Sequence, residues 1–405
     1  MNRNTDRENF IPFARPSIGE EEEEAVIKVL RSGWLTTGKI AEKFETEFAG
    51  FVGSKYAAAL NSATAGLHLA LEAAGIKRGD RVITTPFTFA STAEVIRYLG
   101  ADPVFADIEE ETGNISPDLM FKTLSEYNER EKAKIKAVIP VHFAGLPCSM
   151  EEIEDAADKF ELQIIEDSAH AFPVKLAEGR YKGRYAGTVG DMGVYSFYAT
   201  KTITTGEGGM LVTDSKTCYE RVKVMRLHGI DRDVFDRYNS IEGSWKYDIT
   251  APGFKYNMTD LAAALGLVQL KNAVNFLEKR RAIARYYIET FSQYDFLKIP
   301  DYSPEHAWHL FVIRIAPEKL TIGRDGFIEL LKEEGIGTSV HFIPLHIMTY
   351  YKKRYGFKEN DFPESFKRYR NSISIPIYPG LSDDSLQLIS ETVVKIGKKY
   401  YKKAT

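Results

Sequence analysis

One lysine in this sequence stands where it could react covalently with an aldehyde. Lys201 follows the apolar stretch 193–197, which includes Ser196, and precedes a glycine-rich turn and a second apolar stretch at 210–213. Burial between two strands disfavours an ammonium ion and lowers its pKa, so that the neutral amine can form a Schiff base. A surface lysine in a hairpin loop is the alternative, and this segment alone does not exclude it.

A carboxylate at the end of another apolar stretch is the second candidate group. The stretch 163–166 is followed by Asp167 and then by Ser-Ala-His170. Ligands of α/β proteins bind beyond the carboxyl ends of the strands. A carboxylate there can hold a pyridine nitrogen protonated, since opposite charges ~4 Å apart interact by roughly 4 kcal/mol at an effective dielectric constant near 20. Asp167 is therefore expected to face a ligand and Glu166 the opposite side; capping of a following helix is the alternative for Asp167.

Small hydroxyl residues open a predicted helix in the segment 60–70. Free backbone N–H groups of Thr64 and Ala65 at the positive end of the helix dipole would bind a phosphate, although ordinary helix capping explains the same residues. Taken together, the three segments outline one ligand with a phosphate, a ring nitrogen and an aldehyde. No G-x-G-x-x-G follows a predicted strand, so a dinucleotide site is not indicated.

Alternating strands and helices must position these groups. The predicted strands are 81–84, 103–106, 137–141, 163–166, 193–197 and 210–213, and helices are predicted at 65–74, 91–99 and 150–160. Such alternation indicates an α/β protein with a mostly parallel central sheet flanked by helices.

The pattern changes after residue 259. A long helix is predicted at 259–294, then a strand at 308–315, a helix at 324–334, a strand at 338–342 and a last amphipathic helix capped by Ser382. We therefore expect a large ligand-binding domain over residues 1–258 and a smaller C-terminal α+β domain over residues 259–405.

The composition excludes several classes of protein. With 405 residues, 27% charged side chains and a formal net charge of −4, the chain shows no basic surface for nucleic acid or membranes. Its two cysteines, Cys148 and Cys218, form no disulfide framework, and the polar segment 1–9 is unlike a signal peptide, so a cytoplasmic protein is expected. The histidines outside the candidate segment are not spaced as metal ligands, and no metal is expected; they are His142, His228, His306, His309, His341 and His346.

These segments, in this order, resemble the DegT/DnrJ/StrS-type sugar aminotransferases, which are fold-type I enzymes that use pyridoxal 5′-phosphate (PLP). The likeness spans residues 12–380 and is most specific at 33–38, 61–67, 166–170, 196–209, 253–269 and 340–346. Within the family, 253–260 and 307–311 are most similar to the branch that aminates the 4-keto position of UDP-sugars, such as the 4-amino-4-deoxy-arabinose enzyme of lipid A modification.

The resemblance implies a role for each candidate residue. Lys201 would be the catalytic residue that carries the cofactor aldehyde, Asp167 would pair with the ring nitrogen, and His170 would lie beside the phenolic oxygen. Phe89 would stack on the ring. The phosphate is expected at Thr64, Ala65 and Ser196.

The resemblance also implies a homodimer with shared active sites. Many members use an asparagine that reaches the phosphate of the neighbouring subunit, whereas this chain has Lys255, a point charge without the geometry of an amide. Trp34, Thr36 and His341 are candidate substrate contacts, with Thr37 beside them. Trp34, Thr36 and Thr37 could instead connect the N-terminal segment to the large domain.

The implied reaction moves an amino group from an amino acid, glutamate by family likeness, to a nucleotide-linked keto sugar for a surface polysaccharide or glycan. A PLP-dependent sugar dehydratase is one alternative, although that branch replaces the lysine with histidine. A non-catalytic regulatory or binding protein of the same fold is the other. The sequence leaves open the sugar, its nucleotide (UDP or dTDP), C3 or C4 regiochemistry and the pathway.

Overall fold

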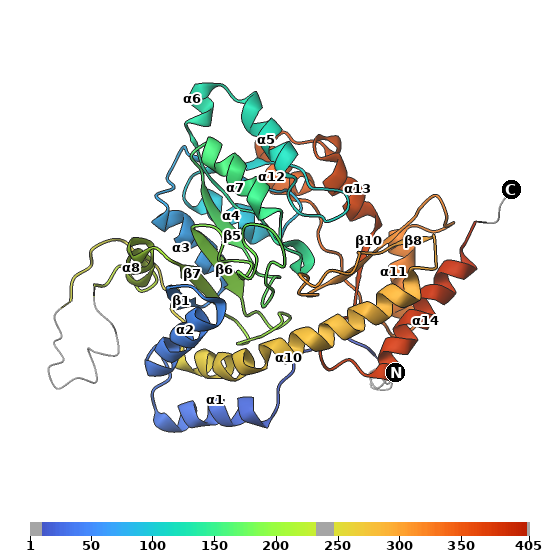
Figure 1. Ribbon diagram of the computed structural model, residues 1–405, viewed down its shortest axis with the longest axis horizontal. Helices are drawn as coiled ribbons and strands as arrows, with labels where there is room; N and C mark the ends of the chain where they lie inside the picture. Colours follow the sequence, from blue (N-terminus) through green and yellow to red (C-terminus); the bar gives the residue numbers. More distant parts are fainter. Residues whose placement is uncertain (1–9, 232–246, 403–405) are drawn as a thin grey trace.

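A seven-stranded sheet forms the centre of the protein in the computed structural model, which describes residues 10–231 and 247–402 (Figure 1). The segment 1–9, on which the signal-peptide expectation rests, lies outside them. The strand order is β1-β7-β6-β5-β4-β2-β3. The strands are β1 Tyr56–Leu60, β2 Arg81–Thr84, β3 Asp102–Phe105, β4 Ile135–Val138, β5 Gln163–Asp167, β6 Met192–Ser196 and β7 Gly209–Thr213. Neighbours from β3 to β6 are parallel, and β7 is antiparallel to both of its neighbours, so the expected mostly parallel sheet is confirmed.

Helices flank this sheet and continue into the C-terminal part of the chain. They are α1 Glu20–Ser32, α2 Lys39–Val52, α3 Ala63–Ala73, α4 Ala90–Tyr98, α5 Pro117–Glu126, α6 Glu129–Lys132, α7 Met150–Lys159, α8 Lys216–Met225, α10 Asp260–Phe291, α11 Arg324–Glu333, α12 Thr349–Tyr355, α13 Pro363–Asn371 and α14 Asp383–Lys399. Short 3₁₀ turns are η1 Phe143–Gly145, η2 Leu345–Ile347 and η3 Glu359–Asp361. None of the helices in the described ranges is both long and apolar enough to cross a membrane.

Alternate residues of β1 show that both faces of the sheet are buried. Ala58 and Leu60 belong to a core that includes α3 and α8, whereas Ala57 and Ala59 belong to a core with α2 and the first half of α10. Side chains of successive strand residues point to opposite faces, so burial of the consecutive residues 57–60 requires helices on both sides. The helices thereby hold strands β5 and β6 in place, and these strands end at the candidate residues Asp167 and Ser196.

Helix α10 connects the large sheet to a second, three-stranded sheet (Figure 1). Thr259 caps the helix, since its hydroxyl accepts the N–H of Ala262. The second half of α10 packs against the antiparallel sheet β10-β9-β8 and helices α11 and α14. The strands of this sheet are β8 Leu297–Lys298, β9 Phe311–Ile315 and β10 Ser372–Ile375. Because one continuous helix serves both cores, a domain boundary between residues 258 and 259 stays a prediction.

Two expectations for the C-terminal part had different outcomes. Ser382 caps α14 through its hydroxyl, which accepts the N–H of Ser385 at 3.2 Å, as predicted. The strand predicted at 338–342 is wrong. In that segment Ser339 makes an isolated bridge to Ser374, and His341 and Phe342 line a cavity instead of continuing the pairing.

Candidate active site

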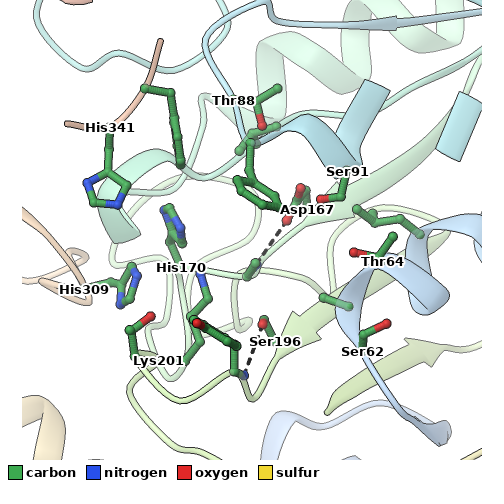
Figure 2. A pocket seen from close by; sticks show the side chains of 18 of the residues that line it. Ser62, Thr64, Thr88, Ser91, Asp167, His170, Ser196, Lys201, His309 and His341 are labelled. Atoms are coloured by element: carbon green, nitrogen blue, oxygen red, sulfur yellow. Dashed lines mark hydrogen bonds between the residues drawn. The ribbon is translucent and has the colours of Figure 1, made fainter. Parts of the chain in front are cut away.

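A cavity of about 440 Å³ lies at the carboxyl edge of the large sheet and brings most of the predicted residues together (Figure 2). The predicted residues that line it are Thr64, Phe89, Asp167, His170, Ser196, Lys201 and His341. Unpredicted residues complete the wall, among them Phe13, Ser62, Thr88, Ser91, His309 and Phe342. Figure 2 shows the histidines toward one end of the cavity and Ser62 and Thr64 toward the other, with Asp167 and Ser196 between them.

Lys201 reaches the cavity from the loop that follows β6. Ser196 ends that strand, and the backbone N–H of Lys201 donates to the carbonyl of Tyr198 at 2.9 Å. Burial lowers the pKa of the Lys201 amine to about 8, although the nearby Asp167 carboxylate opposes the shift. The uncharged amine, which is the form required of a nucleophile, is therefore far more populated near neutral pH than it is in an exposed lysine.

Asp167 is the last residue of β5 and is only 6% exposed. Its Oδ2 accepts the hydroxyl of Thr92 at 2.9 Å, and its Oδ1 accepts the N–H of Ala169 at 3.2 Å. Burial raises the pKa of the Asp167 carboxyl, and the hydrogen bonds from Thr92 and Ala169 and the nearby Lys201 oppose that rise. No helix begins after β5 in this part of the described chain, so Asp167 is not a helix cap.

The N-terminus of α3 forms the opposite end of the cavity, with one difference from the expectation. Ser62 is the N-cap, and its hydroxyl accepts the N–H of Ala65 at 3.1 Å, so the amide of Ala65 is not free. The amides of Ala63 and Thr64 lie in the first turn, where a helix offers no acceptors. Gly209 of β7 packs against this first turn of α3, where a Cβ on residue 209 would lie 2.5 Å from the backbone nitrogen of Ala63. Only glycine lets the strand and the turn approach this closely.

Three neutral histidines line the other end. The rings of His170 and His309 lie 4.4 Å apart, and both Nδ1 atoms are buried without a hydrogen-bond partner in the described residues. His341 pairs its Nδ1 with the hydroxyl of Ser374 at 2.9 Å and stacks on Phe13. Burial, followed by the charge of Lys201, lowers the pKa of His170 and lowers that of His341 to about 4. Burial also lowers the pKa of His309, so the cluster is uncharged at neutral pH.

His309 is a site residue that the sequence did not single out. Trp308 before it has a positive φ of 50°, and the buried guanidinium of Arg280 donates to the carbonyls of Trp308, His309 and Ile377 at 3.2, 3.3 and 2.7 Å. These contacts turn His309 toward the cavity. The likeness of segment 307–311 to family members is the one signal that could have indicated it.

Four predicted residues do not line this cavity of their own chain: Ala65, whose amide Ser62 already binds, and Lys255, Trp34 and Thr36. Lys255 lies on the surface, where its Nζ donates to Asn257 at 2.5 Å. Trp34 donates from its indole N–H to the carbonyl of Thr37 at 3.2 Å, and the carbonyl of Thr36 accepts the N–H of Asp260 at 3.2 Å. These contacts join the N-terminal segment to the start of α10, so the cofactor and substrate roles of Lys255, Trp34 and Thr36 stay predictions.

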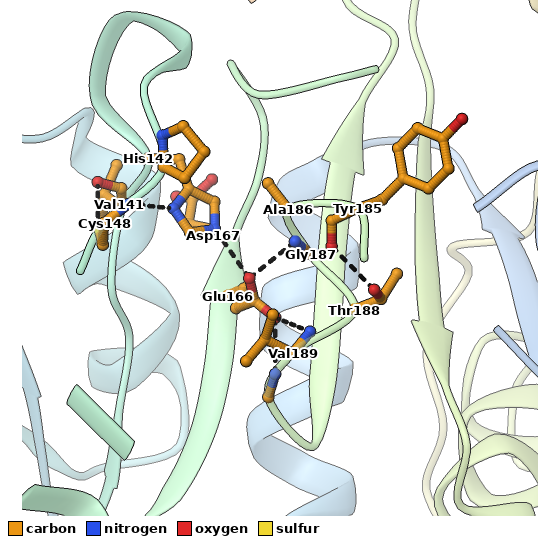
Figure 3. A network of polar contacts seen from close by, with 12 residues as sticks. Val141, His142, Cys148, Glu166, Asp167, Tyr185, Ala186, Gly187, Thr188 and Val189 are labelled. Atoms are coloured by element: carbon orange, nitrogen blue, oxygen red, sulfur yellow. Dashed lines mark hydrogen bonds and ion pairs between the residues drawn. The ribbon is translucent and has the colours of Figure 1, made fainter. Parts of the chain in front are cut away.

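Behind Asp167, a buried network holds the end of β5 (Figure 3). Glu166 points to the opposite face of the strand, as predicted, and its carboxylate accepts His142 Nε2 at 2.9 Å. It also accepts the backbone N–H groups of Gly187, Val189 and Gly190 at 2.7, 2.6 and 2.7 Å. Burial alone would raise the pKa of Glu166, but the bonds from His142 and the loop amides outweigh burial and lower it.

The tautomer of His142 follows from these contacts. The N–H of Cys148 donates to His142 Nδ1 at 3.0 Å, so Nδ1 is an acceptor and Nε2 carries the proton given to Glu166. The backbone N–H of His142 donates to the backbone carbonyl of Asp167 at 3.2 Å. The network therefore fixes the backbone that presents the Asp167 carboxylate.

Replacing Glu166 with Gln is expected to lower the free energy of unfolding by about 3 kcal/mol. All four partners of the Glu166 carboxylate are hydrogen-bond donors. The NH₂ group of glutamine is also a donor, so it would lie against donors and leave them without an acceptor. Urea denaturation followed by circular dichroism measures the loss. Glu152→Gln, an exposed change on α7, is the matched control and should stay within about 0.5 kcal/mol of the unchanged protein. Equal stability of the two variants would contradict the network.

Among the described residues, no group of three or more histidine, cysteine, aspartate or glutamate side chains is arranged to hold a metal ion. The cavity chemistry is instead that of one amine, one carboxylate, neutral imidazoles and a helix N-terminus. These groups suit an organic ligand with an aldehyde, a basic ring nitrogen and a phosphate.

Comparisons with known proteins agree with this arrangement. Residues 16–394 match the model of the DegT/DnrJ/EryC1/StrS aminotransferase family. The chain is 48% identical to the uncharacterized protein MJ1066 of Methanocaldococcus jannaschii over 96% of this chain and 98% of that protein. It is 45% identical to the spore coat polysaccharide biosynthesis protein SpsC of Bacillus subtilis, over 97% of this chain and 98% of that protein.

A solved structure gives the same result for the fold. The putative sugar aminotransferase Spr1654 of Streptococcus pneumoniae, in its pyridoxamine-phosphate (PMP) form, superimposes with a TM-score of 0.87 at 32% identity, over 96% of this chain and 99% of that chain. The same protein is also known in a PLP form, with a TM-score of 0.86. By its sequence along nearly its whole length and by its fold-type I architecture, the chain belongs to the DegT/DnrJ/EryC1/StrS family of sugar aminotransferases, whose cofactor is PLP.

Proposed function

We propose that this protein transfers the amino group of glutamate to the 4-keto position of a UDP-linked sugar, for the synthesis of a surface polysaccharide or glycan. The observation that supports this most is the meeting of the Lys201 amine and the Asp167 carboxylate in one cavity. Likeness to a family of sugar aminotransferases, and 45% identity to a protein named for polysaccharide biosynthesis, support the sugar substrate.

The residues of the cavity fit PLP on three observations. Among the described residues, no cationic side chain is hydrogen-bonded to the buried carboxylate of Asp167, which leaves it for a protonated ring nitrogen. The orphaned Nδ1 of His170 suits the phenolic oxygen beside the aldehyde. Phe89 is 62% exposed at the cavity wall and offers a free aromatic face for the ring. Ser62, Thr64 and Ser196 would hold the phosphate near the start of α3.

The bound cofactor supplies an aldehyde that exchanges amines and a protonated ring that withdraws electrons from the carbon next to the amine. The chain supplies the proton transfers. Lys201 Nζ, whose pKa burial lowers to about 8, takes the proton from the α-carbon of the amino acid in its neutral form and delivers it to the cofactor side. Asp167 holds the ring nitrogen protonated throughout.

The sugar is expected at the histidine end of the cavity. His309 and His341 are neutral and lie opposite the start of α3, so they can exchange hydrogen bonds with sugar hydroxyls without the cost of a buried charge. Both active sites would be completed across a homodimer, in which Lys255, Trp34 and Thr36 serve the neighbouring subunit. We place the enzyme in the cytoplasm, since Cys148 and Cys218 are both free thiols.

A substrate panel tests the proposal. Purified holoenzyme is incubated with glutamate and with UDP- and dTDP-linked 3-keto or 4-keto sugars, and products are identified by mass spectrometry. Formation of a UDP-4-amino sugar that depends on glutamate supports the proposal. Loss of a hydroxyl without amine transfer would favour the dehydratase, and no turnover with any sugar or amino acid would favour a binding protein.

The rate of PLP capture by the apo-protein is expected to rise with pH and to level off above about 8. Only the neutral amine attacks the aldehyde, and burial lowers the pKa of Lys201 to about 8. Stopped-flow absorbance between about pH 6 and about pH 10 measures the profile, with Nα-acetyl-lysine, whose side-chain pKa is about 10.4, as the reference. A capture rate that climbs in parallel with that of Nα-acetyl-lysine up to about pH 10 would contradict a buried amine.

A further inference from the structure

Two buried threonines from another part of the chain support the Asp167 carboxylate. Thr92 lies in the first turn of α4, is fully buried, and donates its hydroxyl to Asp167 Oδ2 at 2.9 Å. The hydroxyl of Thr88 lies 2.8 Å from that of Thr92. Thr88 faces the cavity together with Asp167 (Figure 2), whereas Thr92 lies outside the cavity lining. Thr92 therefore contacts the carboxylate without being placed to touch a ligand.

The direction of this hydrogen-bonded chain follows from the number of protons. A threonine hydroxyl has one proton, and an ionised carboxylate only accepts. The proton of Thr92 therefore lies in its bond to Asp167, and Thr88 must donate to Thr92. A hydrogen bond donated to a carboxylate stabilises the ionised form and is roughly twice as strong as a bond between neutral groups.

No other side chain in the described part of the chain donates a hydrogen bond to the Asp167 carboxylate. Among the described residues, Thr92 is the one side chain that hydrogen-bonds to the Asp167 carboxylate; the second donor is the backbone N–H of Ala169. Lys201 acts on Asp167 through charge without a hydrogen bond to it, and Glu166 points to the opposite face with its own donors. Loss of the Thr92 hydroxyl would leave Oδ2 buried without its donor.

We propose that Thr92 is a positioning residue, whose hydroxyl keeps Asp167 ionised and oriented toward the ring nitrogen of the cofactor. This inference rests on the proposed pairing of Asp167 with that nitrogen. It adds a residue of α4, distant in sequence from β5, to the machinery that controls the cofactor ring.

The test compares two ligands in matched variants. Thr92→Val removes the hydroxyl with little change of shape, and Thr92→Ser keeps the hydroxyl. Thr84→Val is the control, because Thr84 is equally buried and donates to the carbonyl of Ile139 at 2.9 Å, away from Asp167. Dissociation constants are measured by fluorescence titration of each apo-protein with PLP and with an analogue whose ring nitrogen is replaced by carbon.

The expected readout is the preference for PLP over this analogue. It should fall by about tenfold or more in Thr92→Val, the effect of one hydrogen bond to a charged group, and persist in Thr92→Ser and Thr84→Val. A structural role alone would weaken both ligands equally in Thr92→Val and leave the preference unchanged, which would overturn the inference. Thr92→Ala serves as the second variant if the valine protein does not fold.

The two proposals fail in different ways. If the unchanged protein binds PLP and the carbon analogue equally well, Asp167 does not pair with the ring nitrogen, and the proposed cofactor geometry falls together with the role of Thr92. If the unchanged protein discriminates and Thr92→Val discriminates as strongly, the proposed function stands and only the role of Thr92 is refuted.

Discussion

Replacing Lys201 with Ala is expected to reduce amine transfer by at least about 10⁴-fold. The variant loses both the nucleophile for the aldehyde and the base that moves the α-proton, and no other lysine lines the cavity in the described part of the chain. Single-turnover kinetics with glutamate and the keto sugar measure the loss. PLP added to the variant should also keep the absorbance of a free aldehyde, because the amine that reacts with the aldehyde is absent.

Two controls separate these roles of Lys201. Lys201→Arg keeps a positive charge but offers neither a nucleophile nor a base near neutral pH, so it should be as inactive as the alanine variant. Added methylamine should restore part of the proton transfer in Lys201→Ala and none in Lys216→Ala, an exposed control that is expected to have full activity from the start. Activity of Lys201→Ala within tenfold of the unchanged protein would refute the assignment.

The strands that position Lys201 and Asp167 could be predicted because their signal is local. The segments at β2, β5 and β6 are short apolar runs bounded by polar or glycine-containing turns, and the predicted 81–84 coincides with β2. β1 was missed because its Tyr-Ala-Ala-Ala-Leu sequence has little preference for a strand. Its pairing with β7, far away in sequence, provides what the local residues do not.

The strand predicted at 338–342 was wrong because a local pattern was present without the pairing that a strand needs. Its alternation of polar and apolar residues resembles a strand, but only Ser339 finds a partner, and His341 and Phe342 are turned into the cavity. Periodicity indicates which residues are buried and does not indicate whether a sheet or a cavity wall buries them.

In the candidate site too, the residues at the ends of local elements could be predicted, and those placed by long-range contacts could not. Lys201, Asp167 and Thr64 stand at the ends of predicted elements, where ligands are expected, and a single sequence was sufficient to propose them. Thr92 lies 75 residues before Asp167, on a helix whose face toward β5 no local pattern indicates. The inward turn of His309 likewise depends on Arg280, a contact made only in three dimensions.

Asp167→Asn is expected to lower kcat for amine transfer by about 10³-fold, while PLP still attaches to Lys201. The charged pair with the ring nitrogen is worth roughly 4 kcal/mol, and each 1.36 kcal/mol corresponds to a factor of ten in rate. Asparagine keeps the size of the side chain and can still accept the hydroxyl of Thr92, so the change removes the charge at the cost of the weaker bond from the N–H of Ala169. The half-reaction with glutamate, followed by stopped-flow absorbance, isolates the step that needs the protonated ring.

The decisive control for Asp167→Asn uses a cofactor that carries the charge itself. PLP methylated at the ring nitrogen is permanently cationic, so it should recover a substantial part of the lost rate in Asp167→Asn and give no gain in the unchanged protein. Asp214→Asn, at an aspartate after β7 that accepts the N–H of Lys55, should keep the normal rate with either cofactor. If the asparagine variant retains near-normal kcat with ordinary PLP, the ring needs no carboxylate, and Asp167 serves only to anchor the end of β5.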